Sequence, residues 1–256
     1  MKIKRILTAT AAAALVITSV FAGGNFKEVQ AKDNDTPKKI TLGYWESPNG
    51  ELLTKEKGSL EAAFQDTDIE WVEFQSGTDI LTAMQSGSVD FATIGTPPAA
   101  LGLAKGYPFK IFYLHDVIGE SEGLAVKKES GISSVKDLKG KKIATTFAST
   151  SHFSLLSALE AEGLSETDVT LYDMSAPDMY ASWQRGEIDG AYVWEPVKSK
   201  LLDNGGAEIV SSEKMAEKGA LTAEVGIVSN SFYEKYPDVV KKYIDILDES
   251  VKSYRD

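Results

Sequence analysis

A short pattern occurs twice in this chain and constrains its fold more than any other feature. Residues 84–97 read MQSGSVDFATIGTP, and residues 183–196 read WQRGEIDGAYVWEP. Gln, Gly, Asp, Ala and Pro fall at the same positions in both copies. Each copy is typical of a helix end, a glycine turn, a buried strand and a proline near the next helix. Any two βαβ units share such a pattern, so the repeat predicts two similar α/β lobes even if the copies are unrelated.

Strand and helix patterns alternate along the rest of the chain, which predicts parallel sheets built from βαβ units. The expected strands are 40–44, 69–74, 89–94 and 110–114, and the expected helices are 52–64, 79–85, 97–104 and 152–161. We expect lobe 1 over 38–122 and lobe 2 over 128–221, with a return strand and C-terminal helix over 222–256. Segments 123–127 and 221–229 are predicted as strands that cross between the lobes.

Composition excludes several classes of function. The net charge of -11 argues against nucleic-acid binding, which requires basic surface. The chain has no cysteine and only two histidines, so it has no thiolate nucleophile and little from which to build a zinc site or a Ser-His triad. We therefore expect no catalytic residue, no metal and no cofactor.

The N-terminus resembles an export signal. Three basic residues precede an uncharged run over 6–20, and small-residue cleavage sites follow at 20–22 and 29–31. A membrane anchor is the alternative, but the run is short for a span. We expect a signal segment over 1–31, with Gly24 where a lipidated cysteine would stand, and a protein located outside the cytoplasm.

Ligands of open α/β sheets bind beyond the carboxyl ends of the strands, so the residues after each predicted strand are candidates for the site. They are Tyr44, Trp45, Ser47, Gly95, Thr96, Pro97, Ser149, Thr150, Ser151, His152, Trp194 and Glu195, and the two predicted interlobe strands add Glu122 and Glu224.

Two groups of these candidates precede predicted helices. Residues 95–97 and 149–152 offer free N–H groups and hydroxyl donors at positions where a helix N-terminus favours an anion. Ordinary N-capping is the alternative for the Ser and Thr residues. His152 could cap its own helix or donate to the anion.

The aromatic and acidic candidates have alternatives too. Tyr44, Trp45 and Trp194 could line a pocket or hold a cation on their rings, or they could simply pack in a core or hinge. The carboxylates that could pair with an ammonium group are Glu46, Glu122, Glu195 and Glu224.

Two segments resemble the taurine branch of a known family of solute-binding proteins. Residues 148–156, ASTSHFSLL, and 183–194, WQRGEIDGAYVW, are similar to segments of taurine-binding proteins. Residues 95–98, GTPP, resemble the loop after the third strand in the wider family that binds nitrate, sulfonates and thiamine precursors. The resemblance covers the chain after the signal segment.

The resemblance implies a type II periplasmic-binding-protein fold that closes on a small sulfonate and delivers it to an ABC importer with membrane permease subunits. It implies a monomer without ATPase activity, and the chain has no G-x-x-x-x-G-K-[ST] loop. The taurine branch has an Asp and a Trp where this chain has Glu224 and Gly226, so another sulfonate is an alternative ligand. Relatives also continue beyond the position of Asp256, which suggests a truncated or short variant.

Other functions remain open at this stage. The same fold could serve a receptor for nitrate, a phosphonate or a pyrimidine precursor. A desulfinase-like enzyme is the further alternative, but those relatives depend on a cysteine that this chain lacks.

Overall fold

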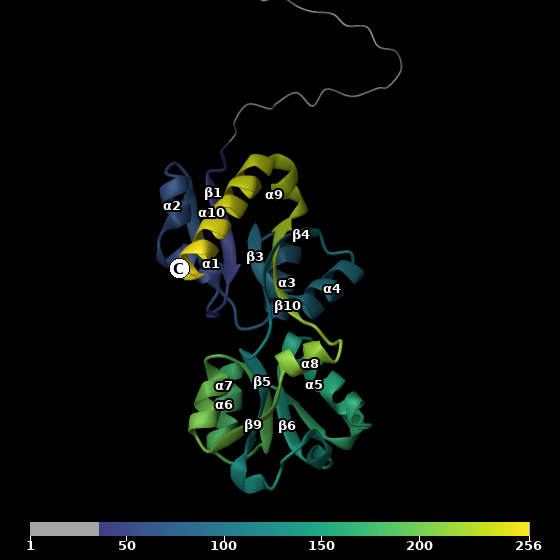
Figure 1. Ribbon diagram of the computed structural model, residues 1–256. Coiled ribbons are helices and arrows are strands. Elements are labelled where there is room, and N and C mark those ends of the chain that lie inside the picture. The colour runs from purple at the N-terminus through teal and green to yellow at the C-terminus, as the bar shows by residue number, and fades with distance from the viewer. Residues whose placement is uncertain (1–35, 256) are drawn as a thin grey trace, which may run out of the picture. The chain divides into compact units, whose positions relative to one another are not determined.

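The computed structural model describes residues 36–255 (Figure 1). The signal segment expected over 1–31 lies outside the described residues. In the described part of the chain, no helix is long and apolar enough to cross a membrane.

The first lobe is built on a five-stranded sheet with the order β2-β1-β3-β10-β4. Its strands are β1 (Lys39–Tyr44), β2 (Asp68–Glu73), β3 (Phe91–Gly95), β4 (Phe109–Val117) and β10 (Ala223–Ser229). Strands β1, β2 and β3 are parallel, and β10 runs antiparallel between β3 and β4. Four of the five strands therefore point the same way.

Helices cover both faces of this sheet. They are α1 (Gly50–Glu56), α2 (Ser59–Ala63), α3 (Gly77–Ser86), α4 (Thr96–Ala104), α9 (Asn230–Lys235) and α10 (Pro237–Arg255). One core cluster joins α2, α9 and α10 to the sheet around Phe91 and Tyr243. A second joins α3 and α4 to the other face around Ile80 and Ile94. The predicted helix over 52–64 is two helices, because Gly58 adopts a left-handed conformation with φ of 61° between them.

The second lobe repeats this plan with the strand order β7-β6-β8-β5-β9. Its strands are β5 (Glu122–Lys127), β6 (Lys142–Thr145), β7 (Thr170–Asp173), β8 (Gly190–Trp194) and β9 (Gly206–Ser211). Its helices are α5 (Thr150–Ala161), α6 (Ala176–Gln184), α7 (Val197–Asp203) and α8 (Ser212–Glu217), with short 3-10 turns at Lys128–Ser130, Val135–Leu138 and Glu166–Asp168. Strand β5 takes the antiparallel position that β10 takes in the first lobe.

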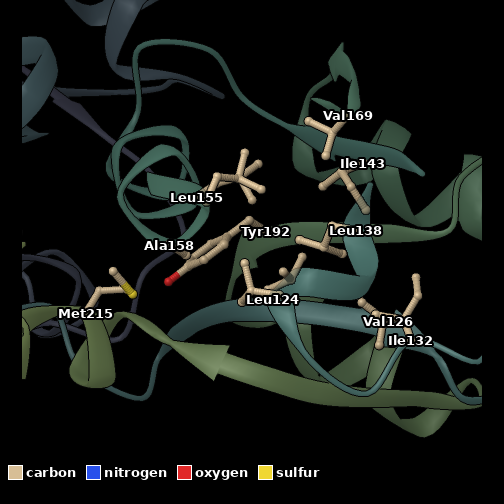
Figure 2. Close-up of a cluster of buried hydrophobic side chains, with 12 residues drawn as sticks. Leu124, Val126, Ile132, Leu138, Ile143, Leu155, Ala158, Val169, Tyr192 and Met215 are labelled. Atoms are coloured by element: carbon tan, nitrogen blue, oxygen red, sulfur yellow. The ribbon is translucent and has the colours of Figure 1, made fainter. Parts of the chain in front are cut away.

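The second lobe also has two core clusters, one on each face of its sheet. Figure 2 shows one cluster, in which Leu124 of β5, Ile143 of β6, Tyr192 of β8 and Leu155 of α5 converge. A second cluster packs α6 and α7 on the opposite face around Trp183.

The repeated motif forms the same structure in both lobes. Asp90 accepts a hydrogen bond from the Thr41 N–H at 2.9 Å, and Asp189 accepts one from the Lys142 N–H at 2.8 Å. In each lobe the aspartate thereby ties the start of the central strand to the start of its parallel neighbour. The two lobes are equivalent strand by strand, as the repeat predicts.

The prediction that 123–127 and 221–229 cross between the lobes is wrong. Strand β5 lies wholly in the second sheet and β10 wholly in the first. Both strands are buried and have neighbours on either side, which a crossing ribbon would lack. The chain crosses at 118–121 and 218–222, where the Ile118 N–H donates to the Thr222 carbonyl at 3.0 Å.

Candidate functional site

A pocket forms where the carboxyl ends of the parallel strands of the two sheets meet. It is lined by Trp45, Ser47, Pro48, Ser76, Gly77, Gly95, Pro98, Asp116, Ile118, Ser121, Glu122, Ser149, Thr150, Trp194, Glu195 and Glu224. Among these described residues there is no Lys, Arg or His, whereas four are carboxylic acids. Any anion that binds here must therefore be held by neutral donors.

Three helices begin at the pocket. Ser76 caps α3, Gly95 precedes α4, and Ser149 caps α5, and all three of these residues line the pocket. The first N–H groups of a helix have no partners within the helix and carry partial positive charge. These helix starts therefore supply the donors that an anion requires.

The hydroxyl groups of Ser149 and Thr150, at the start of α5, are already engaged within the protein. Ser149 donates to the Thr146 carbonyl at 2.6 Å and accepts from the His152 N–H at 3.2 Å. Thr150 donates to Glu122 at 2.5 Å. Ser149 therefore caps its helix, and backbone N–H groups are the donors that remain for a ligand at this end.

Glu122 is an internal anchor of the second lobe. Its side chain is 1% exposed and accepts hydrogen bonds from Thr150 on α5 and Ser212 on α8, both at 2.5 Å. Burial raises the pKa of this carboxyl, and the hydrogen bonds oppose that shift. Both of its oxygens have protein partners, which makes Glu122 a poor candidate for pairing with a ligand cation.

Glu195 is likewise paired within the second lobe. One oxygen accepts the Ser199 N–H at 3.0 Å, and the other lies 3.9 Å from the ammonium group of Lys198. Lys198 is buried and also donates to the Glu120 carbonyl and to Glu208. The charge of Glu195 is therefore partly neutralised before any ligand binds.

Glu224 lies on the opposite, first-lobe side of the pocket and is 8% exposed. It accepts hydrogen bonds from Trp45 Nε1 at 3.1 Å and Asn49 Nδ2 at 3.0 Å. Burial, followed by the nearby Asp116 carboxylate, raises the pKa of Glu224 to about 8. Trp45 thus contributes both a pocket wall and the orientation of this acid.

Five predicted site residues are not brought to the pocket: Tyr44, Thr96, Pro97, Ser151 and His152. Tyr44 packs edge-on against Trp71, and the Thr96 hydroxyl accepts the Ala223 N–H. Ser151 is fully buried, because successive residues at a helix start point in different directions. Pro97, the second residue of α4, does not line the pocket, whereas its neighbour Pro98 does.

His152 lies with its ring stacked on Phe147, the two ring centroids being 4.6 Å apart. Its Nδ1 accepts the Ala148 N–H at 3.1 Å, at a residue with φ of 59°. This geometry favours the first of the two roles proposed for His152: the side chain stabilises the start of its own helix and does not contact an anion.

Sequence reasoning missed Pro48, Ser76, Gly77, Pro98, Asp116, Ile118 and Ser121. The strand-end rule applies equally to the second and fourth strands, and there it would have found Ser76 and Asp116. Gly226, which stands where the taurine branch has a Trp, does not line the pocket. A Cβ added to Gly226 would lie 2.8 Å from Phe112, so an aromatic ring already fills that space inside the lobe.

Two α/β lobes joined by two crossing segments, with a pocket at their strand ends, define the fold of type II periplasmic binding proteins. The chain belongs to the NMT1/THI5-like family, whose family model matches residues 50–255.

Two similar proteins are described as binding taurine or aliphatic sulfonates. The taurine-binding periplasmic protein of Escherichia coli (strain K12) is 41% identical over 175 residues, which cover 68% of this chain and 54% of that protein. A putative aliphatic sulfonates-binding protein of Bacillus subtilis (strain 168) is 32% identical over 221 residues, covering 86% of this chain and 66% of that protein. The chain thus spans between about half and two thirds of the length of these relatives.

The solved structure of an alkanesulfonate-binding protein has a similar fold. The alkanesulfonate-binding protein SsuA from Xanthomonas axonopodis pv. citri, bound to MOPS, superposes with a TM-score of 0.76 at 27% identity. The match covers 84% of this chain and 73% of that one.

Proposed function

We propose that this protein is the extracytoplasmic solute-binding component of an ABC importer and that it captures taurine or a related small sulfonate. The taurine-binding and sulfonate-binding relatives support the ligand class, and the periplasmic location of one of them supports a role outside the cytoplasm. Export from the cytoplasm, a monomeric state and delivery to membrane permease subunits are parts of the same proposal.

One observation carries the ligand class: the pocket combines three helix starts with four acids and has no basic side chain among its described residues. A sulfonate is fully ionised and needs only donors, which the helix N–H groups supply. Glu122 and Glu195 are paired within the protein, whereas Asp116 and Glu224 remain to repel a simple anion and to favour a ligand that also carries a positive charge. This distribution of charge suits a zwitterion such as taurine.

Capture works by closure of the lobes around the ligand. The pocket takes residues from both sheets, and the two crossing segments at 118–121 and 218–222 are the places where the chain can bend. Trp45 and Trp194, one from each lobe, exclude water from the bound ligand. In this mechanism the protein makes and breaks no covalent bond.

The alternative ligands and the enzymatic alternative have less support. Nitrate and phosphonates without an amine carry no cation to offset the acids of the pocket, and a pyrimidine precursor would leave the helix N–H groups without an anion. Desulfinase chemistry through a cysteine is unavailable, because the sequence contains none.

Thermal unfolding tests the proposal. The protein is heated alone and with taurine, ethanesulfonate, longer alkanesulfonates, sulfate, nitrate or phosphate. A ligand present at ~100 times its Kd adds about 2.7 kcal/mol, which raises the midpoint by about 5–10 °C. We expect this increase with taurine or another sulfonate. An increase with nitrate or phosphate alone, or no increase with any sulfonate, would contradict the proposal.

A further inference from the structure

Two acids face each other on the first-lobe side of the pocket. Asp116 on β4 lies opposite Glu224 on β10 in the strand register, and both line the pocket. No described residue lining the pocket has a basic side chain that could neutralise them. Two neighbouring carboxylates without a counter-charge are unfavourable unless a proton or a ligand cation joins them.

The groups around this pair are neutral or acidic. Trp45 and Asn49 each donate one hydrogen bond to Glu224, and the Glu224 N–H donates to the Asp116 carboxylate. Glu51, buried behind them and bonded to the Tyr243 hydroxyl, adds further negative charge. Each carboxylate oxygen can accept more than one hydrogen bond, so both acids keep acceptor capacity toward the pocket.

The protonation of the pair reflects this arrangement. Burial and the Asp116 charge raise the pKa of Glu224 to about 8, and burial also raises the pKa of Asp116. At neutral pH the empty pair therefore holds a proton, which an incoming cation can displace.

A metal ion is a weaker candidate for this place than an organic cation. Among the described residues, no group of three or more Asp, Glu, His or Cys side chains is arranged to hold a metal. An ammonium group has three N–H donors, enough to reach both carboxylates and still meet a third partner.

We propose that Asp116 is a second cation-binding carboxylate, which acts with Glu224 to select zwitterionic aminosulfonates over alkanesulfonates of the same length. This inference rests on the proposed sulfonate-binding function and adds a specificity residue to it. Glu224 orients the cation through its ties to Trp45 and Asn49, and Asp116 contributes the second negative charge.

Calorimetric titration with two matched ligands tests the inference. Taurine and ethanesulfonate share the two-carbon sulfonate and differ in the amine. Both are titrated into the wild type, Asp116→Asn, Glu224→Gln and Asp203→Asn, the last of which removes one charge from the exposed end of α7. We expect Asp116→Asn to weaken the affinity for taurine about tenfold or more, as for loss of a charge-assisted hydrogen bond. The affinity for ethanesulfonate should stay unchanged or increase. Asp203→Asn should bind both ligands like the wild type.

Proton release gives a second readout, which a purely structural role of Asp116 would not change. The titrations are repeated at pH 7 in buffers of different ionisation enthalpy. Taurine should displace close to one proton from the wild type and fewer from Asp116→Asn, whereas ethanesulfonate should displace none.

The outcomes separate the two proposals. Equal weakening of taurine and ethanesulfonate by Asp116→Asn, or no change in either, would overturn the role of Asp116 while sulfonate binding stands. Failure of the folded wild type to bind either ligand would overturn the sulfonate function and this inference together.

Discussion

Gly95 and Thr150 meet across the pocket with no room for a side chain on the glycine. A Cβ added to Gly95 would lie 2.7 Å from Thr150 Cγ2. Gly95 ends β3 in the first lobe, and Thr150 begins α5 in the second. The Thr150 hydroxyl donates to Glu122, which holds the methyl group toward Gly95. The approach of the two lobes therefore depends on a missing methyl group.

Gly95→Ala should weaken ligand binding by about tenfold, because the lobes must separate to admit the new methyl group. The φ of Gly95 is -66°, which alanine adopts freely, so the unfolding midpoint of the empty protein should change little. Calorimetric titration with taurine measures the loss. Thr150→Ser removes the opposing methyl group and keeps the hydroxyl, so the double variant should recover affinity. A double variant as weak as Gly95→Ala would show that the contact does not limit closure.

The stability of the empty protein should fall as the pH rises from 6.5 to 8. Burial raises the pKa of Glu51 to about 7 and that of Glu224 to about 8 from 4.5, so the folded state keeps protons that the unfolded state has lost. Burial lowers the pKa of His115 to about 4 from 6.5, so its effect acts mainly below this window. We expect a loss of about 1–2 kcal/mol in urea unfolding.

Glu224→Gln separates the contribution of that acid. This variant should lose less stability across the same window than the wild type does. A stability that stays constant in the wild type between these pH values would contradict the protonated state of the pair.

Ligand binding should change tryptophan fluorescence through Trp45 and Trp194, the two of the four tryptophans that line the pocket. Replacing both with Phe should abolish the change. Trp71 lies on β2 and donates to Glu61, so Trp71→Phe is the matched control and should keep the signal. A signal that disappears only in Trp71→Phe would place the ligand elsewhere.

Asp90→Ala should destabilise the protein by about 1–3 kcal/mol, because it leaves the buried Thr41 N–H without its partner. Asp189→Ala should cost less, since the equivalent bond goes to Lys142, which is exposed, and water can replace it there. Urea unfolding of both variants measures the difference. Equal losses of stability in the two variants would mean that the exposure of the strand start does not affect the loss.

The architecture was readable from the sequence because its signals are local. The repeated Gly87 and Gly186 end helices in a left-handed conformation, and Asp90 and Asp189 follow at the same spacing. The lobe to which a strand belongs, in contrast, depends on contacts between residues that are far apart in the sequence. An apolar run such as β5 looks the same whether it joins one sheet or passes between two, and only its pairing with β8 and β9 decides.

The candidate site was partly predictable for a related reason. The strand-end rule found Trp45, Gly95 and Trp194, and the predicted interlobe strand over 221–229 supplied Glu224; all four residues line the pocket. It could not tell which residues of a helix start turn inward, and so it included His152 and Ser151. It also could not show that Glu122 is satisfied by Ser212, which lies far away in the sequence.

The place of β10 between β3 and β4 also sets the order in which the lobes can assemble as the chain is made. All strands of the second sheet come from the continuous stretch 122–211, so that lobe has its complete sheet available early. The first sheet has a gap between β3 and β4 until residues 223–229 arrive. Glu224 lies on that last strand, so the pocket is complete only when synthesis has passed this point.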